Sequence, residues 1–241
     1  MATLSIHLAG ALDPLGPVAF ISQRLRDYPA GLVVVIAALV LSLAFHEAAH
    51  AWTAHALGDD TAKRMGRLTL NPIAHIDLVN TILLPAVMIA TMGWIFGGAK
   101  PVPVNPANFK NPLRDNAIVA IAGPASNLLL AFLTMIALHG VLKSGAWEGK
   151  MLPDLLAAIV GFNVLLAVFN LVPIPPLDGS RVVTWLLPRD ARHLYGAIEQ
   201  YGILVIFGLI LFVRPFQVAL WNTLNFVESF LYELVTLWGL W

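Results

Sequence analysis

The chain has 241 residues, of which 59% are hydrophobic and only 12% are charged, and its formal net charge is zero. A soluble domain carries roughly 25% charged residues. The low charge and a mean hydropathy of +0.79 therefore indicate a protein that resides in a lipid bilayer. The balanced charge gives no electrostatic basis for binding nucleic acid, and the absence of cysteine excludes disulfides and thiolate metal ligands.

The chain is predicted to be an all-α polytopic membrane protein with about five to six membrane helices. Apolar runs long enough, or nearly so, to cross about 30 Å of hydrocarbon lie at about 30–57, 79–96, 116–142, 153–175, 199–213 and 216–240. The first 29 residues have no unbroken apolar core and resemble an interfacial lead-in more than a secretory signal. We expect one membrane domain over 1–241, with a core at about 30–180 and C-terminal helices at about 196–240.

The first apolar run ends in the pentapeptide from His46 to His50, which has the pattern HExxH. Positions i and i+4 of a helix differ by about 40° of rotation, so His46 and His50 can share one metal ion. Glu47 lies roughly 100° from His46, close enough to hold a water bound to that metal. HExxH occurs by chance in many helices, but Glu and His are costly at membrane depth and are retained there chiefly to line an interior or water-filled site. Metal chemistry within the bilayer is the leading hypothesis.

The segment after this run contains two kinds of local pattern. Residues 64–72 alternate briefly and end in Asn71-Pro72, which predicts a β-strand or small hairpin at the membrane edge. Residues 97–115 are rich in glycine and proline, which predicts an extended loop.

A second motif closes the fourth apolar run, from Asn170 to Gly179. Its three prolines stop the helix and Gly179 permits a sharp turn, which leaves Asp178 at a helix end with its carboxylate free to turn inward. Such a sequence alone is more often an ordinary surface turn. Beside an intramembrane HExxH, however, Asp178 is the natural third ligand. Two His and one carboxylate leave the fourth position of zinc for water, as in catalytic sites.

Three motifs together resemble the site-2 protease family of intramembrane zinc metalloproteases. They are HEAAH at 46–50, Gly-Pro-Ala-Ser-Asn at 123–127 and N-x-x-P-x-P-x-L-D-G at 170–179, in the family's order. The similarity spans roughly residues 30–180, and the stretch 100–106 is similar to a compact bacterial branch without PDZ or CBS domains.

The resemblance implies a role for each matched residue. It makes His46, His50 and Asp178 zinc ligands and Glu47 the general base, and it implies that Asn127 and Asn170 bind or orient the substrate strand. The residues by themselves leave open that the two asparagines merely bridge helices.

The predicted function is a zinc endopeptidase that cuts membrane-spanning proteins. Zinc can activate a water and polarise the scissile carbonyl, and Glu47 can carry the proton to the departing amine. The carbonyls of a transmembrane helix are already hydrogen-bonded, so the substrate must unwind, and a strand near 64–70 could hold it by edge pairing. The alternative is a transporter or metal-binding membrane protein in which the same polar residues line a permeation path. Such a site has no specific need for Glu47.

The two metal motifs also constrain topology. Both lie at the ends of their helices, 30–57 and 153–177, so these helices must run parallel. Because 116–142 supplies one crossing, 79–96 must re-enter the membrane or the 97–115 loop must return to the same face. Segments 58–115 and 178–193 then share a face with nine of the 14 Lys and Arg residues. The positive-inside rule places the zinc near the cytoplasmic face of the cell membrane, with lipid and a transmembrane substrate as partners.

Overall fold

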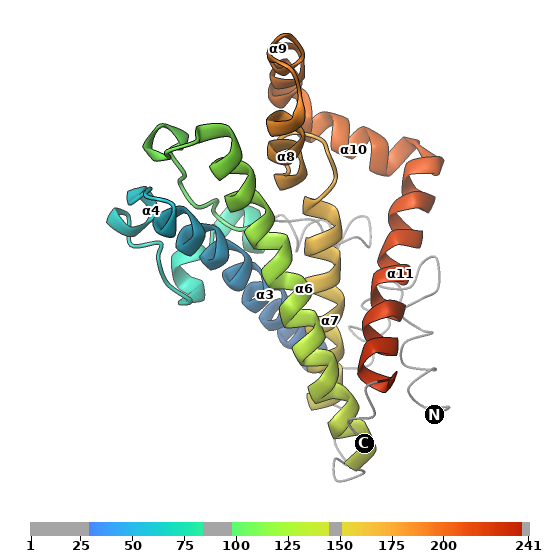
Figure 1. Ribbon diagram of the computed structural model, residues 1–241. Coiled ribbons are helices and arrows are strands. Elements are labelled where there is room, and N and C mark those ends of the chain that lie inside the picture. The colour runs from blue at the N-terminus through green and yellow to red at the C-terminus, as the bar shows by residue number, and fades with distance from the viewer. Residues whose placement is uncertain (1–28, 84–97, 145–150, 238–241) are drawn as a thin grey trace.

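The computed structural model describes residues 29–83, 98–144 and 151–237, and every regular element in these ranges is helical (Figure 1). The long helices are α3 (Pro29–Ala56), α6 (Pro112–Ser144), α7 (Met151–Asn170) and α11 (Arg214–Leu237). The shorter helices are α4 (Thr61–Arg64), α8 (Asp178–Leu186), α9 (Arg189–Ala197) and α10 (Gly202–Phe212). Single 3-10 turns lie at Pro72–His75, Pro106–Asn108 and Glu199–Tyr201, and a π-helical turn at Leu78–Leu83. The all-α prediction is confirmed for these residues.

Helices α3, α6 and α7 pack together as the centre of the molecule, and α6 runs opposite to the other two (Figure 1). Ala38, Ala48 and Ala51 of α3 are completely buried, and such small side chains let neighbouring helices approach closely. Phe162 of α7 packs against the Ala38 end of α3. Because α3 and α7 are parallel, the ends that carry the two metal motifs lie at the same level, as predicted.

Three described stretches are long and apolar enough, by length and composition, to cross a membrane: 112–144, 152–170 and 189–212. The first two are α6 and α7, and they correspond to the runs predicted at 116–142 and 153–175. The third bends between α9 and α10 (Figure 1), so it is not the straight crossing predicted at 199–213. With 11 residues, α10 is only about 16 Å long.

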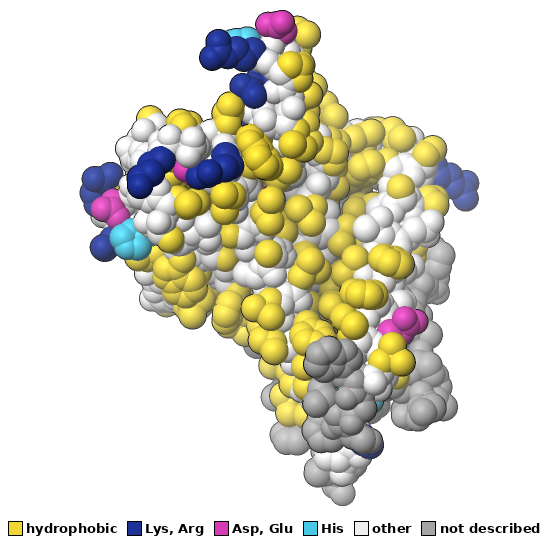
Figure 2. All heavy atoms as spheres, in the orientation of Figure 1, with side chains coloured by type: hydrophobic (Ala, Val, Ile, Leu, Met, Phe, Trp, Pro, Cys, Tyr) yellow, Lys and Arg dark blue, Asp and Glu magenta, His cyan; other side chains and the backbone are white. Residues whose placement is uncertain are grey.

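The surface separates an apolar flank from a charged end. In Figure 2, hydrophobic side chains cover the flank of α6 and α11, whereas most Lys and Arg side chains in view gather at the upper end, over α4, the start of α6 and α9. This is the separation expected of a protein whose helical body lies in lipid and whose connecting segments face water.

The β-strand predicted over residues 64–72 is wrong, because these residues form a helix end followed by turns. Gly66 takes a positive φ of 68°, and its N–H donates to Lys63 O (3.0 Å) while the Arg67 N–H donates to Ala62 O (2.8 Å). This pair of bonds is the Schellman motif that ends many helices at glycine. The buried Arg67 guanidinium donates to Ala74 O, and the buried His75 ring bonds to Thr69 O (2.8 Å). Local and side-chain bonds thus use backbone groups that a strand would need for pairing.

The loop predicted between 97 and 115 is confirmed over residues 98–111, which lie against the end of α3, but it is wrong at its end, because α6 begins at Pro112. Proline is well tolerated in the first turn of a helix, where an N–H would have no partner. The Asn105 N–H and the Asn108 amide donate to the buried Asp59 carboxylate at 2.7 and 2.6 Å. Burial alone would raise the pKa of Asp59, but hydrogen bonds from Thr61, Asn105 and Asn108 outweigh it and hold that pKa below its usual value. The charged Asp59 therefore anchors the loop.

Most of the predicted re-entrant run 79–96 lies outside the described residues. The chain segments before and after its undescribed part meet, because the hydroxyl of Thr81, near the start of the run, donates to Gly98 O (2.7 Å) and the Lys100 N–H donates to His75 O (2.9 Å). The re-entrant prediction requires this proximity.

Candidate metal centre

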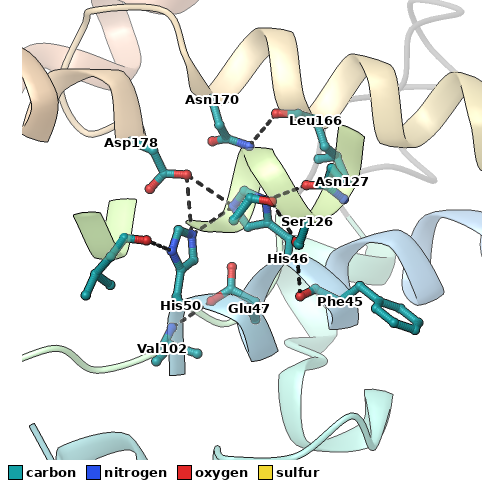
Figure 3. Close-up of polar contacts among 12 residues, drawn as sticks. Phe45, His46, Glu47, His50, Val102, Ser126, Asn127, Leu166, Asn170 and Asp178 are labelled. Carbon is teal, nitrogen blue, oxygen red and sulfur yellow. Dashed lines mark hydrogen bonds and ion pairs between the residues drawn. The ribbon is translucent and has the colours of Figure 1, made fainter. Parts of the chain in front are cut away.

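Two helices that are distant in sequence bring His46, His50 and Asp178 together (Figure 3). Both histidines lie on the buried face of α3, and Asp178 is the first residue of α8 rather than the end of the preceding helix. Nε2 of His46 lies 3.0 Å from Nε2 of His50, and Asp178 Oδ2 lies 3.2 and 3.3 Å from these two nitrogens. Within the described residues, this is the one group of three or more His, Asp or Glu that could hold a metal ion.

The partners of the imidazoles determine which ring nitrogen faces the centre. His50 Nδ1–H donates to the backbone oxygen of Val119 (2.7 Å), and His46 Nδ1–H donates to Asn127 Oδ1 (2.6 Å). Both Nε2 atoms therefore carry lone pairs. The buried Asp178 Oδ2 has no hydrogen-bond donor. Three electron-pair donors that converge in this way need either protons or a metal ion between them, and one metal ion satisfies all three at once.

The spacing of these atoms fits zinc. In a tetrahedral site with zinc–nitrogen and zinc–oxygen bonds of about 2.0–2.1 Å, the ligand atoms are about 3.3–3.4 Å apart. The observed separations are 3.0, 3.2 and 3.3 Å. Three protein ligands leave one position of the metal for water or substrate, which is the arrangement of catalytic zinc sites.

Gly123 explains how α6 can lie directly behind both imidazoles. A Cβ atom at this position would lie 2.7 Å from His46 Cε1 and closer still to the His50 ring. Any larger residue would displace the rings. The sequence motif at 123–127 therefore contributes a close approach of the helix backbone to the ligands as well as Asn127.

Gly179 has a related role on the other side of the centre. The sharp turn predicted at Gly179 is wrong, since this residue has no positive φ and lies in the first turn of α8. A Cβ atom here would lie 2.8 Å from Val172 O and closer to Leu171 O. The missing side chain lets α8 dock on the chain just after α7, which brings Asp178 to the histidines.

Glu47 lies beside the two histidines of α3 and is buried (Figure 3). Its Oε2 accepts the N–H of Val102 at 2.8 Å, from the segment 98–105, which belongs to no helix or strand. Val102 is the only backbone donor of the tripeptide 101–103, because Pro101 and Pro103 have no N–H. The contact holds one carboxylate oxygen and leaves Oε1 for chemistry.

The two predicted substrate residues differ in their surroundings. Asn127 is completely buried, and both Nδ2 hydrogens are used, one to Ser42 O (3.1 Å) and one to Asn163 Oδ1 (2.6 Å). It has no donor left for a substrate and matches the alternative of a helix bridge. Asn170 is half-buried near Asp178 (Figure 3), and among the described residues its amide makes only one bond, to Leu166 O (2.9 Å).

Sequence reasoning missed Val102, Val119, Ser42 and Asn163 as neighbours of the centre. The first two act through backbone atoms, which no residue type reveals. Asn163 did offer a signal, because an amide inside an apolar run is costly and usually has a partner.

Residues 143–213 match peptidase family M50, a range that contains Asp178 but not the histidines. The chain is 41% identical over 210 residues to the "Putative zinc metalloprotease YwhC" of Bacillus subtilis, covering 84% of this chain and 91% of that protein. It is 30% identical to the "Putative zinc metalloprotease Rip2" of Mycolicibacterium smegmatis, over 99% of this chain and 93% of that protein. "Stage IV sporulation protein FB" of Bacillus subtilis is 28% identical over 57% of this chain and 46% of its own length. No solved structure matches the chain.

Proposed function

We propose that this chain, which belongs to peptidase family M50, the site-2 proteases, and is a zinc metalloprotease of that family, hydrolyses peptide bonds of membrane-spanning substrates. One observation carries the proposal: the zinc-type cluster and Glu47 lie together inside the helical bundle. Gly123, which backs the cluster, is 11 residues into α6, about 16 Å along the helix from its start. Such a depth is within reach of a substrate helix in the bilayer.

We assign the metal to His46 Nε2, His50 Nε2 and Asp178 Oδ2. When bound there, zinc activates a water and polarises the scissile carbonyl. Glu47 Oε1 accepts the proton of the attacking water and returns it to the departing amine, while Val102 keeps the carboxylate in place through Oε2. The histidine rings do not change tautomer during the reaction, because Val119 and Asn127 hold their Nδ1 hydrogens.

The substrate must be held as extended chain, and the absent strand at 64–72 cannot do this. We propose that the unwound peptide lies beside the segment 98–105, which belongs to no helix or strand and touches Glu47. Asn170 lies close to Asp178 with an amide that has unused bonding capacity, so it can bond to a freed peptide group. Freed peptide groups in a dry site need such partners, since each unpaired one costs about 1–3 kcal/mol.

The protein is proposed to be a single domain of the cell membrane with its zinc site near the cytoplasmic face. The Lys and Arg side chains at the upper end in Figure 2 lie over α4, α9 and the start of α6, and α8, which begins at Asp178, lies toward the same end of the molecule in Figure 1. To test this, Lys63→Cys and Lys110→Cys are made singly in the cysteine-free chain. Both should react with an impermeant thiol reagent from the cytoplasmic side only. Labelling of the two positions from opposite sides would refute the topology.

Transport is the weaker alternative. A permeation site needs metal ligands, but it gains nothing from a carboxylate that is held by a backbone N–H and kept out of the ligand set. Glu47 is held in this way.

The decisive experiment compares cells that produce the wild-type protein with cells that produce Glu47→Gln. Membrane-retained fragments are identified by mass spectrometry, and the zinc content of both purified proteins is measured. We expect transmembrane proteins that accumulate uncut only in Glu47→Gln cells, with one zinc per chain in both proteins. Identical fragments in the two strains, together with zinc flux through vesicles that contain the protein, would overturn the proposal.

A further inference from the structure

A string of buried polar side chains runs through the bundle to His46. It begins at Asn163 on α7, includes Ser42 on α3, and reaches Asn127 on α6. Each of these three residues is 0% exposed. Asn163 Nδ2 donates to Ser42 Oγ (2.7 Å), Asn127 Nδ2 donates to Asn163 Oδ1 (2.6 Å), and His46 Nδ1–H donates to Asn127 Oδ1 (2.6 Å). Polar groups at this depth are costly unless every one is satisfied.

Backbone carbonyls determine whether the oxygen or the nitrogen of each asparagine amide faces its neighbour in this string. Ile159 O accepts from Asn163 Nδ2 (2.7 Å), and Ser42 O accepts from Asn127 Nδ2 (3.1 Å). The Ser42 hydroxyl donates to Ala38 O (2.8 Å), so its oxygen is left to accept from Asn163. A carbonyl can only accept, so each contact decides which end of an amide must face it. The orientation of both amides therefore follows from chemistry, and no choice between oxygen and nitrogen remains open.

The orientation of the Asn127 amide determines which tautomer His46 adopts. With its nitrogen held by Ser42 O and Asn163 Oδ1, Asn127 must present its oxygen to His46. An oxygen there selects the tautomer with hydrogen on Nδ1, whose Nε2 lone pair can bind metal. If the Asn127 amide were reversed, its nitrogen would face His46 Nδ1 and favour the tautomer with hydrogen on Nε2. That tautomer has no Nε2 lone pair to bind zinc.

We infer that Asn163 and Ser42 are positioning residues of the zinc site, which act through Asn127 to hold His46 in its metal-binding tautomer. The inference rests on the proposed zinc ligands, and it gives Asn127 a role behind the metal in place of the predicted substrate contact. The competing explanation is that the string only holds α3, α6 and α7 together.

The test measures zinc affinity by competition with a chelator on the purified full-length chain, with thermal stability measured in parallel. Asn163→Leu should weaken zinc binding on the order of tenfold, within the range seen for partners of metal ligands. Thr134→Val is the matched control, because Thr134 is also a buried polar residue, lies on the same helix as Asn127 two turns further along, and takes part in none of the hydrogen bonds of the string. It should leave zinc affinity unchanged whatever it does to stability.

A double substitution separates the two explanations. If Asn163 acts through Asn127, the pair Asn127→Ala and Asn163→Leu should bind zinc no more weakly than Asn127→Ala alone. Additive losses in zinc affinity, or wild-type affinity in Asn163→Leu, would overturn the inference. Should Asn163→Leu fail to fold, Ser42→Ala serves instead, since it removes one hydroxyl and keeps the carbonyl that orients Asn127. It should weaken zinc binding severalfold, and unchanged affinity would count against the inference.

The same measurements distinguish this inference from the zinc assignment itself. If His46→Ala retains full zinc affinity, the ligand assignment fails. If His46→Ala loses zinc while Asn163→Leu and Ser42→Ala do not, only the positioning role fails.

Discussion

The two halves of the metal centre are built in different ways. The histidine half lies on one helix, is almost completely buried, and each ring is held by an acceptor on α6. The aspartate half comes from a separate short helix, and the Asp178 side chain is 20% exposed and has no donor to its inner oxygen. The histidines are thus positioned by the core of the protein, whereas Asp178 is positioned by docking of α8. Disturbing each half should therefore have different consequences.

The largest effect is expected from loss of a histidine. His46→Ala or His50→Ala should remove zinc and abolish cleavage, because one imidazole and the carboxylate of a separately docked helix bind the metal more weakly than two imidazoles fixed on one helix and lose it to a chelator. Asp178→Ala should retain zinc loosely, since the histidine half remains intact. Zinc content after dialysis, measured by elemental analysis, distinguishes the three variants. Full zinc retention in Asp178→Ala would remove Asp178 from the ligand set.

Loss of the general base should affect chemistry without affecting the metal. Glu47→Gln should keep one zinc per chain and slow cleavage about a thousandfold, since general acid–base catalysis contributes between a hundredfold and ten-thousandfold. The rate is measured on any substrate found in the fragment comparison, with zinc content as the control. A Glu47→Gln protein that cleaves at the wild-type rate would exclude Glu47 as the base.

Substitution of Gly123 and of Gly179 should show whether the histidine half and the aspartate half of the metal centre contribute to zinc affinity independently. Gly123→Ala inserts a methyl group against both imidazoles, so zinc affinity should fall toward the level of a lost histidine. Gly179→Ala pushes α8 away from the end of α7, so the protein should behave like Asp178→Ala and bind zinc weakly. Both affinities are measured by chelator competition. Equal losses in the two variants would show that the halves are not independent.

The smallest effect concerns the loop that reaches Glu47. Asp59→Asn replaces one of the two acceptor oxygens by a donor NH2 group, so the hydrogen bonds from Asn105 and Asn108 are weakened or lost at a cost of about 1–3 kcal/mol. The loop 98–111 should then open more often. Trypsin should then cut faster after Lys110. Asp60→Asn is the matched control, because Asp60 is exposed and bonds to His55 instead. Equal cutting rates in the two variants would show that Asp59 does not anchor the loop.

Low pH should also release the loop that Asp59 anchors. The pKa of Asp59 is lowered in the folded protein, so its contribution to stability is present above the pKa of an unfolded aspartate and is lost as the pH falls through the lowered folded value. Cutting by an acid-tolerant protease should rise in that range for the wild type and rise less for Asp59→Asn, which has already lost the anchor.

Local spacing and composition determined much of this protein. The separation of His46 from His50 puts both on one helix face whatever surrounds them, because helix geometry is local. The low charge and the apolar runs indicate a bilayer for the same reason, since each residue contributes its transfer energy independently. Asp178 was reached through a motif, and the parallel course of α3 and α7 was deduced from the requirement that Asp178 meet the histidines.

Only the tertiary structure decided how those ligands are held. The tautomer of His50 depends on a backbone oxygen of Val119, and that of His46 depends on a string that ends at Asn163, more than a hundred residues away. Glu47 meets the backbone of Val102, 55 residues later. The missing strand at 64–72 shows the same limit, because Gly66, Arg67 and His75 direct local bonds that outweigh an alternating pattern. Residue type can show that a buried amide such as Asn163 needs a partner, but it does not identify that partner, and it gives no sign of contacts made by backbone atoms.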